Sequence, residues 1–88
     1  MTVYELIGHN LKELRTNLGY TQERLANELN TSASHLRSLE KGRGNPTVKT
    51  LECLADTLGV PLLQFFNEEI KSDEQSANSP ASKSQQST

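Results

Sequence analysis

The apolar residues of this chain recur every three or four positions, which is the spacing of one buried face of an α-helix. The first stripe of this kind consists of Val3, Ile7, Leu11, Leu14 and Leu18. No stretch of useful length alternates apolar and polar residues, as a half-buried β-strand would require. The sequence therefore predicts an all-α fold without a β-sheet.

Capping residues divide the chain into five expected helices. Caps included, the helical segments are residues 2–18, 21–29, 32–40, 47–58 and 61–66. Serine and threonine are favoured N-caps because the side-chain oxygen accepts a hydrogen bond from an otherwise unpaired backbone N–H group. The candidate N-caps are Thr2, Thr21, Ser32 and Thr47. Gly19 and Gly59 are the expected C-terminal stops, and Pro61 is acceptable near the start of the last helix.

The middle helices each have an apolar face that is expected to point inward. Its members are Leu25, Ala26, Leu29, Leu36, Leu39, Val48, Leu51, Leu54, Ala55 and Leu58. We expect residues 1–68 to form one small domain and residues 69–88 to be a disordered tail. Residues 72–88 are rich in serine and contain no large apolar side chain. They cannot bury enough surface to offset the loss of chain entropy on folding.

Charge is distributed unevenly along the chain, although the formal net charge is only −2. Residues 1–66 are neutral overall, whereas residues 67–88 contain four acidic and two basic side chains. The short window 31–50 has a net charge of +3, from Arg37, Lys41, Arg43 and Lys49 against Glu40. The overall balance argues against a wholly basic nucleic-acid coat, but the local cluster is a candidate contact surface for an anionic partner.

Cys53 is the only cysteine, so no intrachain disulfide can form, and a reducing compartment fits best. Its side chain is expected to be half-buried on the fourth helix. No stretch approaches the roughly 18 apolar residues of a membrane span. The N-terminus lacks the basic and apolar regions of a signal peptide. These features predict a cytoplasmic protein with no membrane contact.

No group of residues predicts an enzyme, a metal site or a cofactor site. The acidic residues of the helices fall where helical spacing predicts solvent, and none forms a catalytic pair; they are Glu13, Glu23, Glu28, Glu52 and Asp56. His9 and His35 are the only histidines, and neither has a neighbouring cysteine or histidine. We expect His35 on the flank of the third helix, and no metal, cofactor or small-molecule ligand.

Two helices of about eight or nine residues, joined by a turn of three or four, describe a helix-turn-helix. Here the joint runs from residue 29 to residue 32, and small Ala26 lets the two helices cross closely. The second helix of such a pair protrudes and can enter the major groove of DNA. Serine hydroxyls, an alanine methyl and an arginine suit base edges. The candidate base contacts are Ser32, Ala33, Ser34, Arg37 and Ser38.

Three motifs follow one another along residues 14–60: L-R-x-x-L-G-x-T-Q-E-x-L-A, S-L-E-K-G and P-T-x-x-T-L-x-x-L-A-x-x-L-G-V. With them, roughly residues 5–66 resemble the phage-repressor and Cro-like helix-turn-helix family, also called the Xre type. The resemblance implies a five-helix, lambda-repressor-like DNA-binding domain whose third helix reads the major groove. It also implies that Gln22 reaches a phosphate or supports the reading helix. Arg15 and Glu40 match positions that form an internal ion pair in this family, which would fix the reading angle.

The residues around the third helix are candidates for contacts with the DNA backbone. Besides Gln22 they are Lys41, Arg43, Asn45, Thr47 and Lys49. Phosphate contacts position a domain on DNA without reading sequence. The alternative is an ordinary solvated face, and Arg37 has the further alternatives of a phosphate clamp or a pair with a nearby glutamate. Ser32 is expected to cap its helix and to touch a phosphate as well.

The expected fifth helix holds more large apolar residues than one face of a short helix can bury. Leu62, Leu63, Phe65 and Phe66 occupy four of five consecutive positions. Surplus exposed apolar surface marks a partner site. We therefore expect a homodimer seam there, with two DNA half-sites about one turn, roughly 34 Å, apart.

The sequence thus favours a sequence-specific DNA-binding transcriptional regulator. Its simplest form is a repressor that binds a palindromic operator as a dimer and occludes a promoter. Restriction–modification controllers and antitoxins fall within the same class, although no amphipathic pattern follows Ile70 for folding on a toxin. The alternative from another class is a protein-interaction module that keeps the fold without binding DNA. Overall acidity and the serine-rich face favour this alternative, whereas the basic window 31–50 favours DNA.

Overall fold

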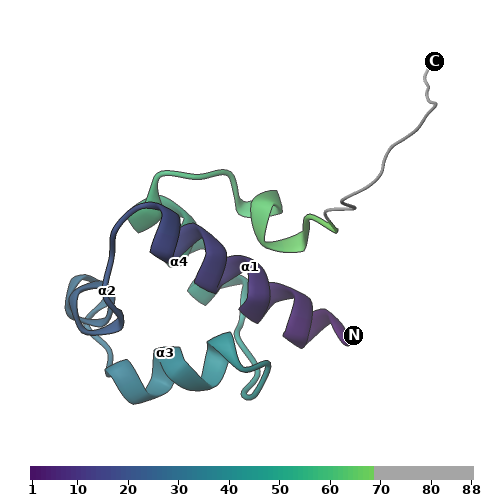
Figure 1. Cartoon of the computed structure of the whole chain (residues 1–88), viewed down its shortest axis with the longest axis horizontal. Coiled ribbons are helices and arrows are strands. Elements are labelled where there is room, and N and C mark those ends of the chain that lie inside the picture. Colours follow the sequence, from purple (N-terminus) through teal and green to yellow (C-terminus); the bar gives the residue numbers. More distant parts are fainter. Residues whose placement is uncertain (69–88) are drawn as a thin grey trace.

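The computed structural model describes residues 1–68, which form four α-helices followed by a short 3-10 helix (Figure 1). The elements are α1 (Val3–Asn17), α2 (Gln22–Leu29), α3 (Ala33–Glu40), α4 (Val48–Leu58) and η1 (Leu62–Phe66). No strand occurs in this part of the chain. The prediction of an all-α fold is therefore confirmed for residues 1–68, while the tail predicted for residues 69–88 lies outside the described residues.

The four predicted N-caps all form capping hydrogen bonds. Each side-chain oxygen accepts from the backbone N–H three residues later, at 3.0 to 3.1 Å; the caps are Thr2, Thr21, Ser32 and Thr47. Glu5 completes a capping box, since its carboxylate accepts from the backbone N–H of Thr2 at 2.8 Å. At the other end of α4, Gly59 adopts the left-handed conformation with φ +72°. The predicted boundaries of these helices are confirmed.

The hydrophobic core lies where the helices meet. Its buried members are Ile7, Leu11, Leu25, Ala26, Leu36, Leu39, Leu51, Leu54, Ala55, Leu58 and Phe65. The prediction that Val48 points inward is wrong, because its side chain is 67% exposed. Val3 and Leu18 are also largely exposed. All three lie at a helix end. There the apolar stripe extends beyond the neighbouring helices, which cover only its middle.

A left-handed residue makes the tight turn between α2 and α3. Asn30 has φ 60° and ψ 42°, and the backbone N–H of Thr31 donates to the carbonyl oxygen of Ala26 at 2.9 Å. Ala26 is 2% exposed, so its small side chain lies at the close contact. Figure 1 shows α2 nearly end-on and α3 lengthwise, so the two helices cross at a steep angle.

Helix α1 packs directly on the last turn of α3 through Gly8. A Cβ atom at this position would clash with the carbonyl oxygen of Leu39 and would lie 2.7 Å from that of Glu40. A glycine inside a helix costs about 1 kcal/mol relative to alanine. The close approach of the two backbones explains why a glycine occupies this position despite that cost. The same contact holds the end of α3 against α1.

The segment predicted as a fifth α-helix is a single stretch of 3-10 helix, η1. The backbone N–H of Gln64 donates to the carbonyl oxygen of Pro61 at 3.0 Å, which is the three-residue spacing of a 3-10 turn. Pro61 is extended and provides no side-chain cap. Asn10 holds the segment in place, because its Nδ2 donates to the carbonyl oxygens of Phe65 at 2.8 Å and Asn67 at 3.0 Å. The η1 segment as a whole packs on α1 and α4.

Candidate nucleic-acid interface

The outer face of α3 is polar and open to solvent. Ser32, Ser34 and Arg37 are exposed, whereas Ser38 and Ala33 are half-buried and Ala33 packs against the core. The Ser32 hydroxyl accepts a hydrogen bond from the backbone N–H of His35 at 3.1 Å. Its own O–H remains free to donate outward. All five predicted base-contacting residues thus lie along one short helix and its cap, and three of them are fully accessible to a partner.

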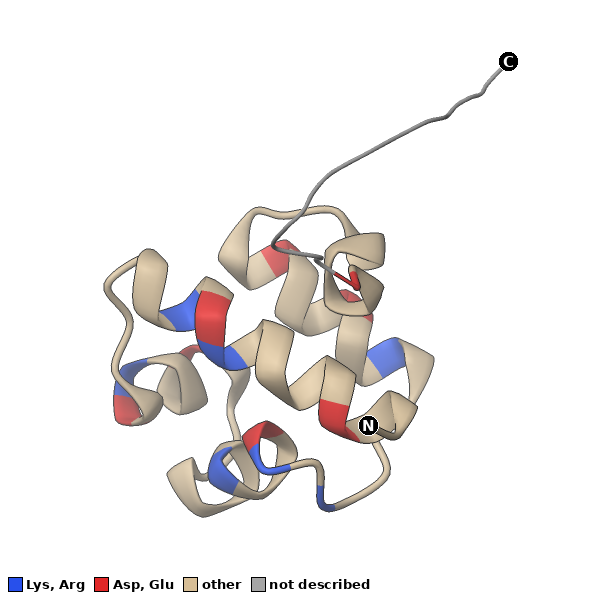
Figure 2. Ribbon diagram, turned by 45° about the vertical axis from the view of Figure 1, so that its right-hand side comes forward, with Lys and Arg blue, Asp and Glu red and all other residues tan. Residues whose placement is uncertain are grey.

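Four exposed cations surround this face: Arg37 on α3, Lys41 at its end, Arg43 in the following loop and Lys49 on α4. Figure 2 shows Lys and Arg recurring along this part of the ribbon. The ion pairs found in residues 1–68 join Arg15 to Glu40 and Arg24 to Glu28. Within those residues the four cations therefore have no carboxylate partner, and their charge is directed to solvent.

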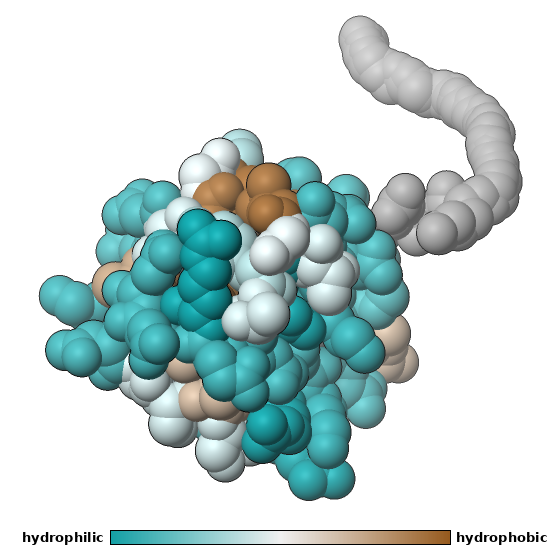
Figure 3. All heavy atoms as spheres, turned by 60° about the vertical axis from the view of Figure 1, so that its left-hand side comes forward, coloured by the Kyte–Doolittle hydropathy of each residue, from teal (hydrophilic) through white to brown (hydrophobic). Residues whose placement is uncertain are grey.

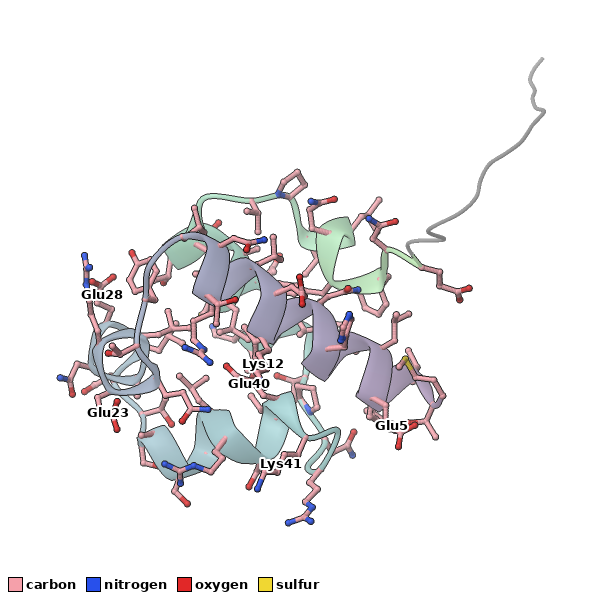
Figure 4. All side chains as sticks on the ribbon, viewed as in Figure 1. Glu5, Lys12, Glu23, Glu28, Glu40 and Lys41 are labelled. Atoms are coloured by element: carbon pink, nitrogen blue, oxygen red, sulfur yellow. The ribbon has the colours of Figure 1, made fainter. Side chains whose placement is uncertain are left out.

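A buried ion pair fixes the end of α3. The guanidinium of Arg15 donates from Nε to Glu40 Oε2 and from Nη2 to Glu40 Oε1, the latter at 3.2 Å. Both side chains are nearly inaccessible to solvent, with 10% and 4% of their surfaces exposed. Figure 4 shows Glu40 directed from α3 toward α1, whereas the neighbouring Lys41 lies on the outer side.

Two further hydrogen bonds extend this ion pair to the other elements of the motif. Arg15 Nη1 donates to the carbonyl oxygen of Tyr20 at 2.8 Å, and Gln22 Nε2 donates to Glu40 Oε1 at 3.0 Å. The network joins α1, the loop after it, the first residue of α2 and the last residue of α3. Since hydrogen-bonded charge networks in low dielectric are rigid when fully satisfied, α3 is held at one angle.

The loop between α3 and α4 contributes two more predicted residues, Asn45 and Thr47, which lie in sequence between the cations Arg43 and Lys49. Both are exposed. Gly42, with φ +78°, allows the chain to reverse, and the backbone N–H of Arg43 then donates to the carbonyl oxygen of Ser38 at 2.9 Å. The structure therefore combines a protruding polar helix with cations and hydroxyl groups that continue along the next loop.

The apolar residues of η1 are divided between the core and the surface. Phe65 is 0% exposed, so its predicted place in a dimer seam is wrong: the ring fills the domain's own core. Leu62 is half-buried, whereas Leu63 is 75% exposed and Phe66 is 37% exposed. Figure 3 shows one face of the molecule, largely hydrophilic but with a compact hydrophobic patch. Leu62, Leu63 and Phe66 remain available on the outside of η1, and we call them the η1 patch.

Sequence reasoning missed two residues that position the site. Gly8 and Asn10 hold α1 to α3 and to η1, respectively. The signal for Gly8 was a glycine inside a strongly periodic helix, which needs a packing reason. Asn10 gave no comparable signal, because its partners are carbonyl groups 55 and 57 residues away. The prediction that Cys53 is half-buried is also wrong, since its side chain is exposed.

Residues 1–68 contain no group of three or more histidine, cysteine, aspartate or glutamate residues that could hold a metal ion. None of the helices described is long and apolar enough to cross a membrane.

The geometry is that of a helix-turn-helix, and comparisons with known proteins give the same class. The sequence model of the Helix-turn-helix (HTH_3) family matches residues 11–65, and the chain belongs to this family. It is therefore a transcriptional regulator with a helix-turn-helix DNA-binding fold of the phage-repressor and Cro-like type.

Three known proteins illustrate the relationship. An uncharacterised HTH-type transcriptional regulator of Sinorhizobium fredii, y4dJ, is 47% identical over 60 residues, which cover 68% of this chain and 78% of that protein. The immunity repressor protein of Bacillus phage phi105 is 35% identical over 79 residues, covering 88% of this chain but only 55% of that protein. The crystal structure of SinR, the master regulator for biofilm formation, in complex with DNA is similar with a TM-score of 0.64. SinR is 29% identical, and the match covers 69% of this chain and 98% of that chain.

Proposed function

We propose that the chain is a sequence-specific DNA-binding repressor that inserts α3 into the major groove. The observation that carries this proposal is the exposed polar face of α3, surrounded by four cations that have no carboxylate partner in residues 1–68. Exposed cations without partners are suited to neutralising phosphates. The similarity to a phage immunity repressor and to a regulator solved with DNA supports the same function.

The proposed contacts follow from where each side chain lies. Ser34, Arg37 and Ser38 are assigned to base edges, with the arginine pairing to guanine, and the Ala33 methyl to a thymine methyl at the edge of the contact. Ser32 is assigned to a base or phosphate through its free O–H. The remaining assignments are to phosphates, through Lys41, Arg43, Asn45, Thr47 and Lys49. Gln22 is assigned a supporting role rather than a phosphate contact, because it donates to Glu40.

We further infer a homodimer joined through the η1 patch. Leu63 and Phe66 are apolar side chains that stay exposed to solvent in the folded domain. A two-fold interface uses the same patch on both copies. Two α3 helices would then enter successive major grooves of a palindromic operator about 34 Å apart. A dimer on a promoter would exclude the transcription machinery by occupying its site.

The decisive experiment is selection of binding sequences from a random DNA pool with the purified chain, followed by a salt titration on the selected site. We expect an inverted repeat. The logarithm of its affinity is expected to fall with the logarithm of salt concentration by about 0.9 for each phosphate neutralised. No enrichment at low salt would refute the DNA-binding proposal. It would point instead to a protein-interaction module that keeps the fold.

A further inference from the structure

A cavity of about 300 Å³ opens between the end of α2, α3 and the first half of α4. Its floor is apolar and is formed by four leucines, Leu29, Leu36, Leu39 and Leu54. Three of these belong to the buried core, so the cavity reaches down to the core. Its volume is at the lower end of the range of small-molecule sites, roughly 300–1,000 Å³, and such sites combine apolar walls with a few convergent polar groups.

The rim of the cavity carries those polar groups, and all of them suit an anion. Lys49 from α4 and His35 from α3 line it together with the hydroxyls of Thr31, Thr47 and Thr50. No aspartate or glutamate is among the lining residues. The hydroxyls of Thr47 and Thr50 are hydrogen-bonded to each other at 3.0 Å, so one O–H of this pair remains free to donate, besides that of Thr31. An ammonium group and these hydroxyl donors above a leucine floor match a ligand with one negative head group and a short hydrocarbon body.

We propose that this cavity binds a small amphipathic carboxylate, with the carboxylate at Lys49 and the hydrocarbon chain on the leucine floor. The effect of such a ligand on DNA binding rests on the proposed function. Lys49 and Thr47 line the cavity and are also assigned to DNA phosphates. A ligand carboxylate and a DNA phosphate compete for the same ammonium group and hydroxyl. The ligand is therefore an inhibitor of operator binding that acts at the edge of the DNA interface.

The chain contains its own reporter for this site. Cys53 is the only cysteine of the sequence, its side chain is exposed, and it lines the cavity. The rate at which iodoacetamide alkylates Cys53 measures whether the cavity is filled, without any substitution. Hexanoate is the probe, hexanol is the uncharged control of the same chain length, and acetate is the charged control without a hydrocarbon chain.

We expect hexanoate to slow alkylation of Cys53 in a saturable manner and acetate to have no effect. Hexanol is expected to bind about ten-fold more weakly than hexanoate, because a hydrogen bond to a charged group is lost. Lys49→Gln is expected to reduce the hexanoate effect to the level of hexanol. No protection by hexanoate would overturn the inference, and equal protection by hexanol and hexanoate would overturn the assignment of an anionic ligand.

A second variant tests the cavity apart from the DNA contacts. Cys53→Phe places a ring at the cavity wall, and Cys53 is not among the residues assigned to DNA. We expect this variant to bind the selected operator like the parent while hexanoate no longer inhibits that binding. If Cys53→Phe does not fold, the alkylation rates of the parent still decide the question. Protection of Cys53 in a chain that binds no DNA would refute the proposed function alone. Protection without inhibition of operator binding would refute the competition.

Discussion

At the scale of single residues, the buried pair of Arg15 and Glu40 allows a sharp test of what holds α3. Arg15→Met removes the guanidinium and leaves a carboxylate with 4% of its surface exposed and without its charged partner. Removing one partner of a buried ion pair costs about 3–5 kcal/mol. We therefore expect the free energy of unfolding to fall by about this amount in urea denaturation, a large share of the stability of so small a domain.

The matched control for that prediction is the double variant Arg15→Met with Glu40→Leu. Replacing a whole buried ion pair with apolar residues is often neutral or stabilising, so we expect it to regain most of the lost stability. The single variant Glu40→Leu completes the comparison. If the loss of stability in the double variant equalled the sum of the losses in the two single variants, the charges would not act as a pair. Operator affinity of the refolded double variant then reports what the hydrogen bonds contribute to the angle of α3, separately from stability.

Arg37 and Lys49 differ in the kind of DNA contact assigned to them. Arg37→Ala is expected to cost about 1–3 kcal/mol of operator binding and to relax the sequence preference at one base pair. Lys49→Ala is expected to weaken binding to all sequences alike and to reduce the magnitude of the salt slope by about 1. Fluorescence anisotropy with the selected operator and with single-base variants of it measures both effects. Unchanged binding by both variants would refute the assigned interface.

At the scale of elements, the turn between α2 and α3 depends on the conformation of Asn30. A left-handed backbone costs an ordinary L-residue roughly 1–2 kcal/mol, whereas asparagine and glycine tolerate it better. We expect Asn30→Ala to lower the free energy of unfolding by about 1 kcal/mol. Asn30→Gly is the matched control and should be close to neutral. Since Asn30 is exposed and its side chain makes no hydrogen bond within residues 1–68, an equal loss in both variants would mean that the backbone conformation is not the cause.

Local features of the elements could be predicted from the sequence, whereas contacts between distant elements could not. Helix boundaries were predictable because capping is local: each of the four caps uses an N–H group three residues away. The burial of Phe65 was not predictable, because the sequence does not distinguish it from the neighbouring Phe66. Only the packing of η1 on α1 and α4 determines which of the two rings is buried. The cluster of cations around α3 was visible in the charge of residues 31–50. The support of α3 by Gly8 was not visible in this way, because it depends on a close approach of α1 to α3, two elements that are distant in sequence.

At the scale of the whole molecule, the domain has one protruding helix, so in the proposed function a single α3 would read only a short stretch of DNA. Specificity for a long operator would then require a second copy. The η1 patch is the surface assigned to that contact, and Leu63 is its most exposed member. We expect Leu63→Gln to weaken dimerisation by about 3 kcal/mol or more, because each copy loses about 1.5–3 kcal/mol of apolar burial and the contact is two-fold.

Sedimentation equilibrium measures this change, and operator binding shows its consequence. The core and α3 are untouched in Leu63→Gln, so the monomer should keep its helicity and bind a half-site like the parent. It should lose the gain in affinity that the inverted repeat provides. Leu18→Gln is the control, because Leu18 is 49% exposed at the end of α1 and lies outside the η1 patch. If Leu18→Gln dissociates the dimer and Leu63→Gln does not, the two-fold axis passes the end of α1. The two α3 helices would then be spaced by a different geometry.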